Sequence, residues 1–254
     1  MTYSPVTGEK FAEQMLSPMP AGLILSLVQS GWPAYEVLIM SLERLNDLQN
    51  LTFEPYRPGA DEELRDFERA VRLLIDLARR DAVGPKTTTR KAPNGQQPSS
   101  IVFASNPDEE TQVLIDRFKV LVGLDPERSE FRITQDIVRR GPDEITIRMR
   151  SLLALMSFLA QGVEAPAVHL EQGLTGGAYP PDEAVRSSLI PLHVRVAEQR
   201  PEGSFVAVPY AGHWFSIPQQ DHASKQAFSL LNYLFQLKAP RLPTLGPVVT
   251  VPTG

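Results

Sequence analysis

Residues 144–150 have the sequence EITIRMR, and this stretch decides the class of the fold. Its apolar residues, Ile145, Ile147 and Met149, alternate with polar ones, which is the period of a strand with one wet face. A second strand is predicted at Phe131–Gln135, before the turn sequence RRGPDE. The apolar segment SLLALMSFLAQGV follows and predicts a helix. Strands beside a helix predict an α+β protein.

Helical patterns dominate the chain before this strand. Apolar residues at intervals of three and four predict helices at 37–50 and, most clearly, at 61–80. Asn106, followed by Pro107 and three acidic residues, predicts the N-cap of a further helix. Segment 84–100, GPKTTTRKAPNGQQPSS, has few apolar residues and several turn formers, which is typical of a flexible loop or linker.

Strand and helix patterns also follow the central strand. Strands are predicted at 192–197 and 208–217, and a last helix at 221–237 with Asp221 as its N-cap. The tail from residue 239 onward holds four prolines, which exclude a helix. We therefore expect a helical part (1–83), a linker (84–100), an α+β part with a small antiparallel sheet and packed helices (101–238), and an extended Pro-rich tail (239–254).

Composition excludes several classes of function. The 254 residues carry 25 Lys and Arg against 30 Asp and Glu, and the basic residues form no cluster, which disfavours binding to nucleic acid. There is no cysteine, so disulfides, thiolate metal sites and cysteine nucleophiles are absent. No stretch reaches the roughly 18 apolar residues of a membrane-spanning helix.

The stretch VPYAGHWFSI, residues 208–217, predicts a β-hairpin around a turn at Ala211 and Gly212. In that register Tyr210 faces His213, Val208 faces Phe215 and Val206 faces Ile217, which gives one coherent apolar face. Pro209 and Trp214 then pair on the other face. This periodicity explains every residue of the stretch as structure.

Residues that suit catalysis or metal binding are scattered. The histidines at 169, 193, 213 and 222 lack zinc-ligand spacing within one element, although His193 could approach His213 if their strands pair. Ser224 lies beside His222 and Asp221, but neighbours at a helix start cannot form a catalytic triad. No nucleophile elbow, phosphate loop or dinucleotide fingerprint is present. We therefore expect no enzyme activity, no metal and no cofactor.

Five stretches together resemble one protein family. They are YSPVTGEKFAEQMLSPMP, LVQSGWPAYEVL with SLERLNDLQN, ITIRMRSLLALMSFLAQGVEAP, FVAVPYAGHWFSIPQQDHASKQAFSLLNYLFQL and the ending PVVTVPTG. They span nearly the whole chain and resemble a family of uncharacterised proteobacterial lipoproteins. The resemblance implies that this chain is the C-terminal portion of a longer protein, with a signal peptide and a lipidated cysteine upstream. It also implies a periplasmic location, with an anchor in the outer membrane. No functional residue is carried over.

Two functions are open at this point. The first is a non-enzymatic module of the cell envelope that assembles with itself or with another envelope protein. It would be part of an oligomeric outer-membrane complex and contact the membrane only through the upstream lipid. The apolar tail residues Leu245, Val248, Val249 and Val251 would then add as a strand to a neighbour. The alternative is a ligand-binding or hydrolytic domain, with a pocket near the 205–217 hairpin. The candidate residues around the hairpin are His193, Tyr210, His213 and Trp214.

Overall fold

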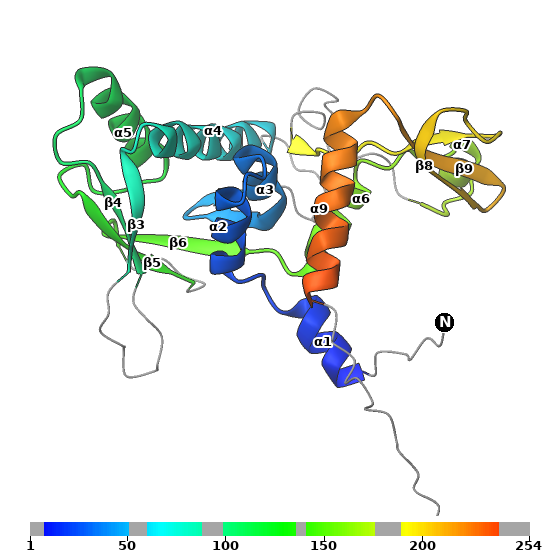
Figure 1. Ribbon diagram of the computed structural model, residues 1–254, viewed down its shortest axis with the longest axis horizontal. Helices are drawn as coiled ribbons and strands as arrows, with labels where there is room; N and C mark the ends of the chain where they lie inside the picture. The colour runs from blue at the N-terminus through cyan, green and yellow to red at the C-terminus, as the bar shows by residue number, and fades with distance from the viewer. Residues whose placement is uncertain (1–7, 51–59, 88–98, 136–140, 176–188, 239–254) are drawn as a thin grey trace, which may run out of the picture.

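The computed structural model describes residues 8–50, 60–87, 99–135, 141–175 and 189–238. Two sheets lie at opposite ends of an elongated molecule, and helices pack between and against them (Figure 1), which confirms the predicted α+β class. The helices are α1 (Gly8–Leu16), α2 (Ala21–Gln29), α3 (Ala34–Ser41), α4 (Ala60–Arg79), α5 (Glu109–Leu121), α6 (Leu152–Ala160), α7 (Ala167–Glu171) and α9 (His222–Lys238). The strands are β1 (Leu42–Leu45), β2 (Leu48–Gln49), β3 (Val83–Thr87), β4 (Ser99–Phe103), β5 (Glu130–Thr134), β6 (Glu144–Met149), β7 (Arg195–Ala197), β8 (Ser204–Tyr210) and β9 (His213–Pro218).

The larger sheet has the strand order β2-β1-β6-β5-β4-β3. Strands β5 and β6 confirm the two strands predicted around RRGPDE, but they run parallel, with Arg132 opposite Glu144. All other neighbours in this sheet are antiparallel, so the sheet is mixed rather than purely antiparallel. The 84–100 segment also differs from the prediction, because residues 84–87 and 99–100 belong to the paired strands β3 and β4.

The helix predicted at 37–50 ends early. Helix α3 stops at Ser41, and the chain turns into the β1–β2 hairpin, which pairs with β6 in the second half of the sequence. The turn residue Asn46 has a φ of 49°, in the left-handed region that asparagine tolerates better than most residues. Helical spacing in this stretch is therefore overridden by pairing with a strand about a hundred residues away.

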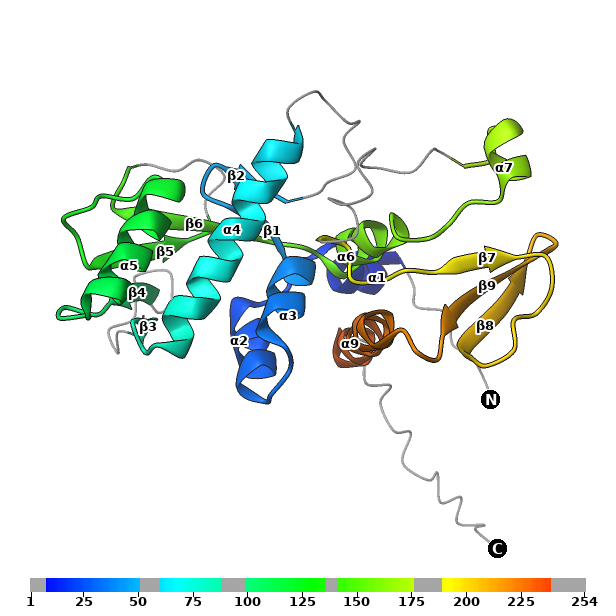
Figure 2. The same ribbon diagram turned by 90° about the horizontal axis from the view of Figure 1, so that it is seen from above.

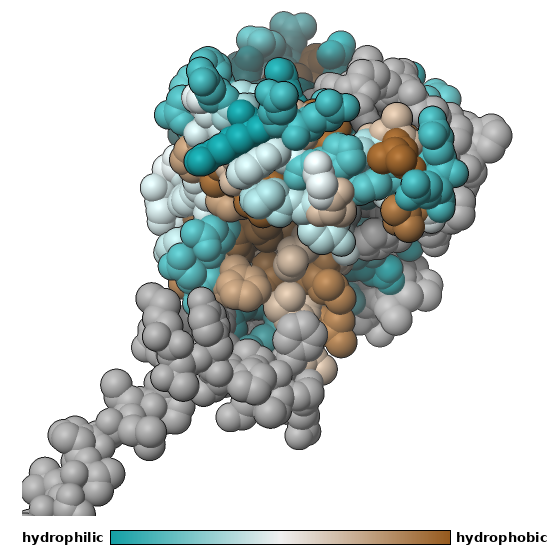
Figure 3. Space-filling model, turned by 90° about the vertical axis from the view of Figure 1, so that its right-hand side faces the viewer, coloured by the Kyte–Doolittle hydropathy of each residue, from teal (hydrophilic) through white to brown (hydrophobic). Residues whose placement is uncertain are grey.

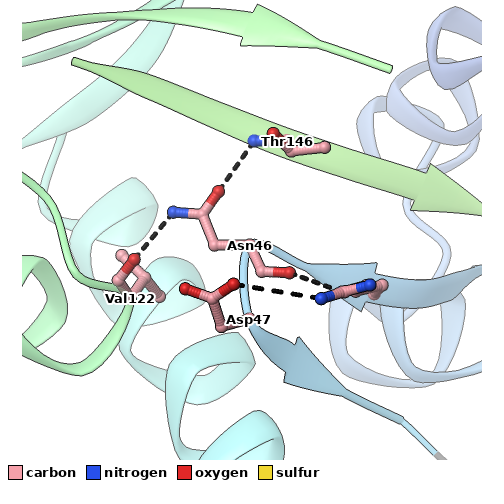
Figure 4. A network of polar contacts seen from close by, with 5 residues as sticks. Asn46, Asp47, Val122 and Thr146 are labelled. Atoms are coloured by element: carbon pink, nitrogen blue, oxygen red, sulfur yellow. Dashed lines mark hydrogen bonds and ion pairs between the residues drawn. The ribbon is translucent and has the colours of Figure 1, made fainter. Parts of the chain in front are cut away.

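Asn46 fixes this turn through its buried side chain (Figure 4). Its amide oxygen accepts a hydrogen bond from the backbone N–H of Thr146 at 2.7 Å, and its Nδ2 donates to the carbonyl of Val122 at 2.7 Å. One side chain thus joins β1 to β6 and to the end of α5. Buried amide groups with both partners supplied define the register of neighbouring elements.

Helices α4 and α5 cover one face of the larger sheet (Figures 1 and 2). The core beneath them is aromatic: Phe103 of β4 lies 5.9 Å from Phe118 of α5 and 5.8 Å from Phe131 of β5, measured between ring centres. Helix α4 confirms the helix predicted at 61–80. The N-cap of α5 is Asp108, whose side chain accepts from the N–H of Thr111, and not the predicted Asn106.

The second region contains α6, α9 and the three-stranded antiparallel sheet β7-β9-β8. Gly162, just after α6, touches the segment that leads into β7. A Cβ at this position would lie 1.8 Å from the carbonyl oxygen of Leu192, so only glycine fits. Hydrogen bonds from Val194 to Gly162 and from Glu164 to Val194, both 2.9 Å between nitrogen and oxygen, close this contact.

Arg150 lies where the two regions meet. It was placed on the wet face of its strand by the sequence pattern, yet it is fully buried. Its Nη1 donates to the carbonyl oxygens of Ile39, Met40 and Leu42 at 2.9 to 3.1 Å, and its guanidinium lies 4.0 Å from the ring centre of Phe158 in α6. Burial lowers the pKa of Arg150 to about 9, so the group is still charged at neutral pH. The positive charge satisfies carbonyls at the end of α3, where the helix dipole is negative.

Candidate functional site

The predicted hairpin is present with the predicted register. Tyr210 faces His213, Val208 faces Phe215 and Val206 faces Ile217. Ala211 and Gly212 form the turn with φ values of 47° and 81°, as a two-residue hairpin turn requires. The turn and the alternation together were sufficient to predict this pairing.

The apolar face of the hairpin is not a core. Val208 is 53% exposed and Tyr210 70% exposed, and the only buried residues of β8 and β9 are Ser216 and Ile217 at the base. Trp214, on the other face, lies under Arg200, whose guanidinium carbon is 5.6 Å from the ring centre. The hairpin is thus anchored at its base and presents apolar side chains at its tip.

His213 contacts a histidine that the sequence did not associate with it. The ring of His169, in α7, lies edge-on to the His213 ring, with 5.2 Å between ring centres and 74° between planes. The Nδ1 of His213 lies 3.1 Å from the carbonyl oxygen of Ala211. No spacing in the sequence relates residue 169 to residue 213.

His193 lies away from this pair. Strand β7 pairs with β9 so that Arg195 is opposite Ser216, which places His193 toward the far end of β9 from His213. Its backbone N–H donates to the hydroxyl of Ser224 at 2.8 Å. The predicted set of His193, His213 and Trp214 therefore does not converge on one pocket.

Ser224 has a structural role in this arrangement. Its side chain is buried, and its hydroxyl donates to Asp221 at 2.7 Å, while the N–H of Ser224 donates to the other carboxylate oxygen of Asp221 at 3.0 Å. Asp221 therefore acts as the predicted cap of α9. Ser224 joins this cap to the segment that precedes β7.

Exposed apolar side chains gather at this end of the molecule. Most large apolar residues that are exposed lie between residues 153 and 237. Helix α7 has no buried residue, and it lies at the same end as the hairpin tip in both ribbon views (Figures 1 and 2). Figure 3 looks onto this end and shows apolar patches among polar ones. We give the name α7–hairpin surface to five exposed residues at this end: Val168, Leu170, Leu174, Val208 and Tyr210.

Three of the four sheet edges among the described residues, β8, β3 and β7, are protected, unlike this surface. The β8 edge contains Pro209 and a register shift between Ser204 and Val206. The β3 edge contains Pro85 and Lys86, and the N–H of Val196 in β7 donates to Glu164. Proline, lysine, irregular register and covering groups all oppose the addition of a further strand.

The remaining expectations concern the tail, metal binding and membrane-spanning helices. The tail residues Leu245, Val248, Val249 and Val251 lie outside the described residues. Within the part of the chain that the structure describes, no group of three or more His, Asp or Glu side chains could hold a metal ion. No helix among the same residues is long and apolar enough to cross a bilayer. Comparison with known protein families, with curated proteins and with solved structures finds no match to this chain.

Proposed function

We propose that this chain is a non-enzymatic assembly module, and that it associates with further copies of itself through the α7–hairpin surface. The observation that carries the proposal is the exposure of five large apolar side chains, Leu174 at 67% and Tyr210 at 70% among them, on adjacent segments. The ring contact of His169 with His213 brings α7 beside the hairpin. Exposed apolar side chains that lie near one another mark sites of protein contact. Tyrosine is also favoured at such sites because it gives a large contact area with a polar end.

Because these strand edges oppose the addition of a further strand, we expect the contact between copies to be made by side chains. A strand from a neighbouring copy would meet Pro209 on β8 or Pro85 on β3, each of which lacks the N–H that a sheet ladder needs. Side-chain packing on the α7–hairpin surface needs no such donor. We therefore place the contact on this surface rather than on an edge that accepts the apolar tail.

The test is the mass of the chain in solution, measured by light scattering over a range of concentrations. We expect the unmodified chain to form oligomers, and the double variant Val208→Lys, Leu174→Lys to be monomeric, because a charge in a packed interface costs several kcal/mol. The control is Val120→Lys in α5, since Val120 is 78% exposed but lies in the other region. A monomeric unmodified chain, or equal masses for both variants, would overturn the self-association.

The contribution of the tail is measured separately with a chain that ends at Lys238. The Nζ of Lys238 donates to the carbonyl and the hydroxyl of Ser17 at 2.7 and 3.0 Å, so this truncation keeps the last described contact of α9. Under the proposal, the truncated chain retains its oligomeric state. Dissociation would move the interface to the tail residues 239–254.

The place of this module in the cell envelope is also a proposal, and it is supported by the family resemblance alone. The module would lie in the periplasm, held at the outer membrane by a lipid on an upstream cysteine, as part of an oligomeric complex. Fractionation of the native cells tests this location. Recovery of the protein from the cytoplasmic fraction, without lipid, would contradict it.

A further inference from the structure

We propose that His169 and His213 bind one divalent late transition-metal ion, of the class of Zn²⁺, Ni²⁺ or Cu²⁺, with water in the remaining coordination positions. The ion would be held within one chain. The two histidines lie beside the α7–hairpin surface, so the test is made at a known oligomeric state. Imidazole nitrogen suits these metals, whereas Ca²⁺ and Mg²⁺ require oxygen ligands.

The distance between the two rings fits a shared ion. Their centres are 5.2 Å apart and their planes are inclined by 74°. Two imidazoles on one tetrahedral ion have ring centres roughly 5 Å apart, given metal–nitrogen bonds of about 2.0 to 2.1 Å. The two side chains come from separate elements, α7 and β9, so small rotations of either ring can direct a nitrogen to the ion.

His213 is oriented as a metal ligand usually is. Its Nδ1 lies 3.1 Å from the carbonyl oxygen of Ala211. Because a carbonyl can only accept, Nδ1 must donate and carries the hydrogen, which leaves the lone pair of Nε2 available in the neutral ring. Metal-bound histidines commonly use their second nitrogen to bind a backbone carbonyl in this way. Ala211 is itself held in the hairpin turn.

Helix α7 is anchored mainly at its start, where the N-cap residue Pro166 is buried. It has five residues and none of them is buried. A helix this short is not stable alone in water. The ring of His169 in α7 contacts the ring of His213 in the hairpin. A pair of aromatic rings stabilises a fold by only about 1 kcal/mol. An ion bound to both rings would join α7 to the β8–β9 turn.

The test uses ZnCl₂ and the ring resonances of the four histidines in the full chain, recorded by NMR at a concentration where the oligomeric state is known. We expect the resonances of two histidines to change with one equivalent of zinc bound per chain. His169→Ala and His213→Ala should each remove one of these two resonances and lower the affinity about tenfold or more. The matched control His222→Ala, at the exposed start of α9, should leave the affinity unchanged.

A second measurement needs no variant. Zinc should slow hydrogen exchange of the α7 amides, such as that of Leu170, while MgCl₂ at the same concentration should not. No change of any histidine resonance at millimolar zinc would overturn the proposal. Equal changes in all four histidines, or an affinity that depends on His193 or His222 instead, would also overturn it.

Discussion

The two sheets differ in how their polar groups are used. In the larger sheet, one face is covered by α4 and α5, and the other carries cross-strand ion pairs such as Lys86 with Glu130 at 2.7 Å and Arg132 with Glu144 at 3.0 Å. In the three-stranded sheet, only Ser216 and Ile217 are buried, and Phe205, Val208 and Tyr210 are exposed. The larger sheet is therefore covered on one face, whereas the three-stranded sheet leaves apolar side chains exposed.

The link between the regions gives the largest expected effect. Arg150→Ala removes a buried charge from the carbonyls of Ile39, Met40 and Leu42 and leaves a cavity beside Phe158. We expect a loss of about 4 kcal/mol in the free energy of unfolding, measured with urea, because buried charged hydrogen bonds and packing are both lost.

The matched control for this change is Arg148→Ala, two residues earlier in the chain. Arg148 is 44% exposed and its contact with Glu43, at 3.3 Å, is a surface ion pair. Its removal should cost at most about 1 kcal/mol. If both variants lost a similar free energy of unfolding, Arg150 would not be the residue that holds the two regions together.

The next effect should be confined to the second region. Gly162→Ala places a Cβ 1.8 Å from the carbonyl oxygen of Leu192, so the contact between the end of α6 and the segment before β7 must open. We expect a loss of about 3 kcal/mol and faster hydrogen exchange in β7, β8 and β9. Gly22→Ala, where a Cβ meets nothing within 4 Å, should be neutral or stabilise by up to about 1 kcal/mol. Faster exchange in the larger sheet would contradict the separation of the regions.

A smaller effect should be confined to the larger sheet. Asn46→Gly keeps the left-handed turn but removes the bonds to Thr146 and Val122, and we expect a loss of about 2 kcal/mol. Asn46→Ala should cost about 1 kcal/mol more, because alanine is strained at a φ of 49°. Equal stability of the two variants in thermal or urea unfolding would contradict the claim that alanine is strained at position 46.

The smallest effect is a pH dependence between α3 and α4. Burial and then the negative charge of Glu68 raise the pKa of Tyr35, whose hydroxyl donates to Glu68 at 2.9 Å. The folded state thus binds this proton more tightly than the unfolded state, so the stabilisation is complete below pH 10 and is lost as pH rises further. Tyr35→Phe should cost about 1 kcal/mol at pH 8. A difference from the unmodified chain that stays constant up to pH 11 would be evidence against this coupling.

Local patterns predicted those elements whose partners are close in sequence. The hairpin register around Ala211 and Gly212, the helix α4 and the Asp221 cap follow from turn chemistry and periodicity. The β1–β2 hairpin was missed because β1 pairs with β6, which comes about a hundred residues later. Arg150 alternates like a wet-face residue, and only the carbonyls at the end of α3 explain its burial. The contact of His169 with His213 is likewise set by packing alone.

The pairing of β1 with β6 also has a consequence for synthesis on the ribosome. β2 pairs with one edge of β1 at once, but the other edge, where Leu45 is opposite Ile147, has no partner until some hundred further residues have been made. At about 5 to 20 residues per second, this interval is roughly 5 to 20 s. The nascent chain must keep β1 from other partners during that time, since contacts so distant in sequence form slowly. A fragment released before β6 emerges would lack the central strand and remain a substrate for chaperones.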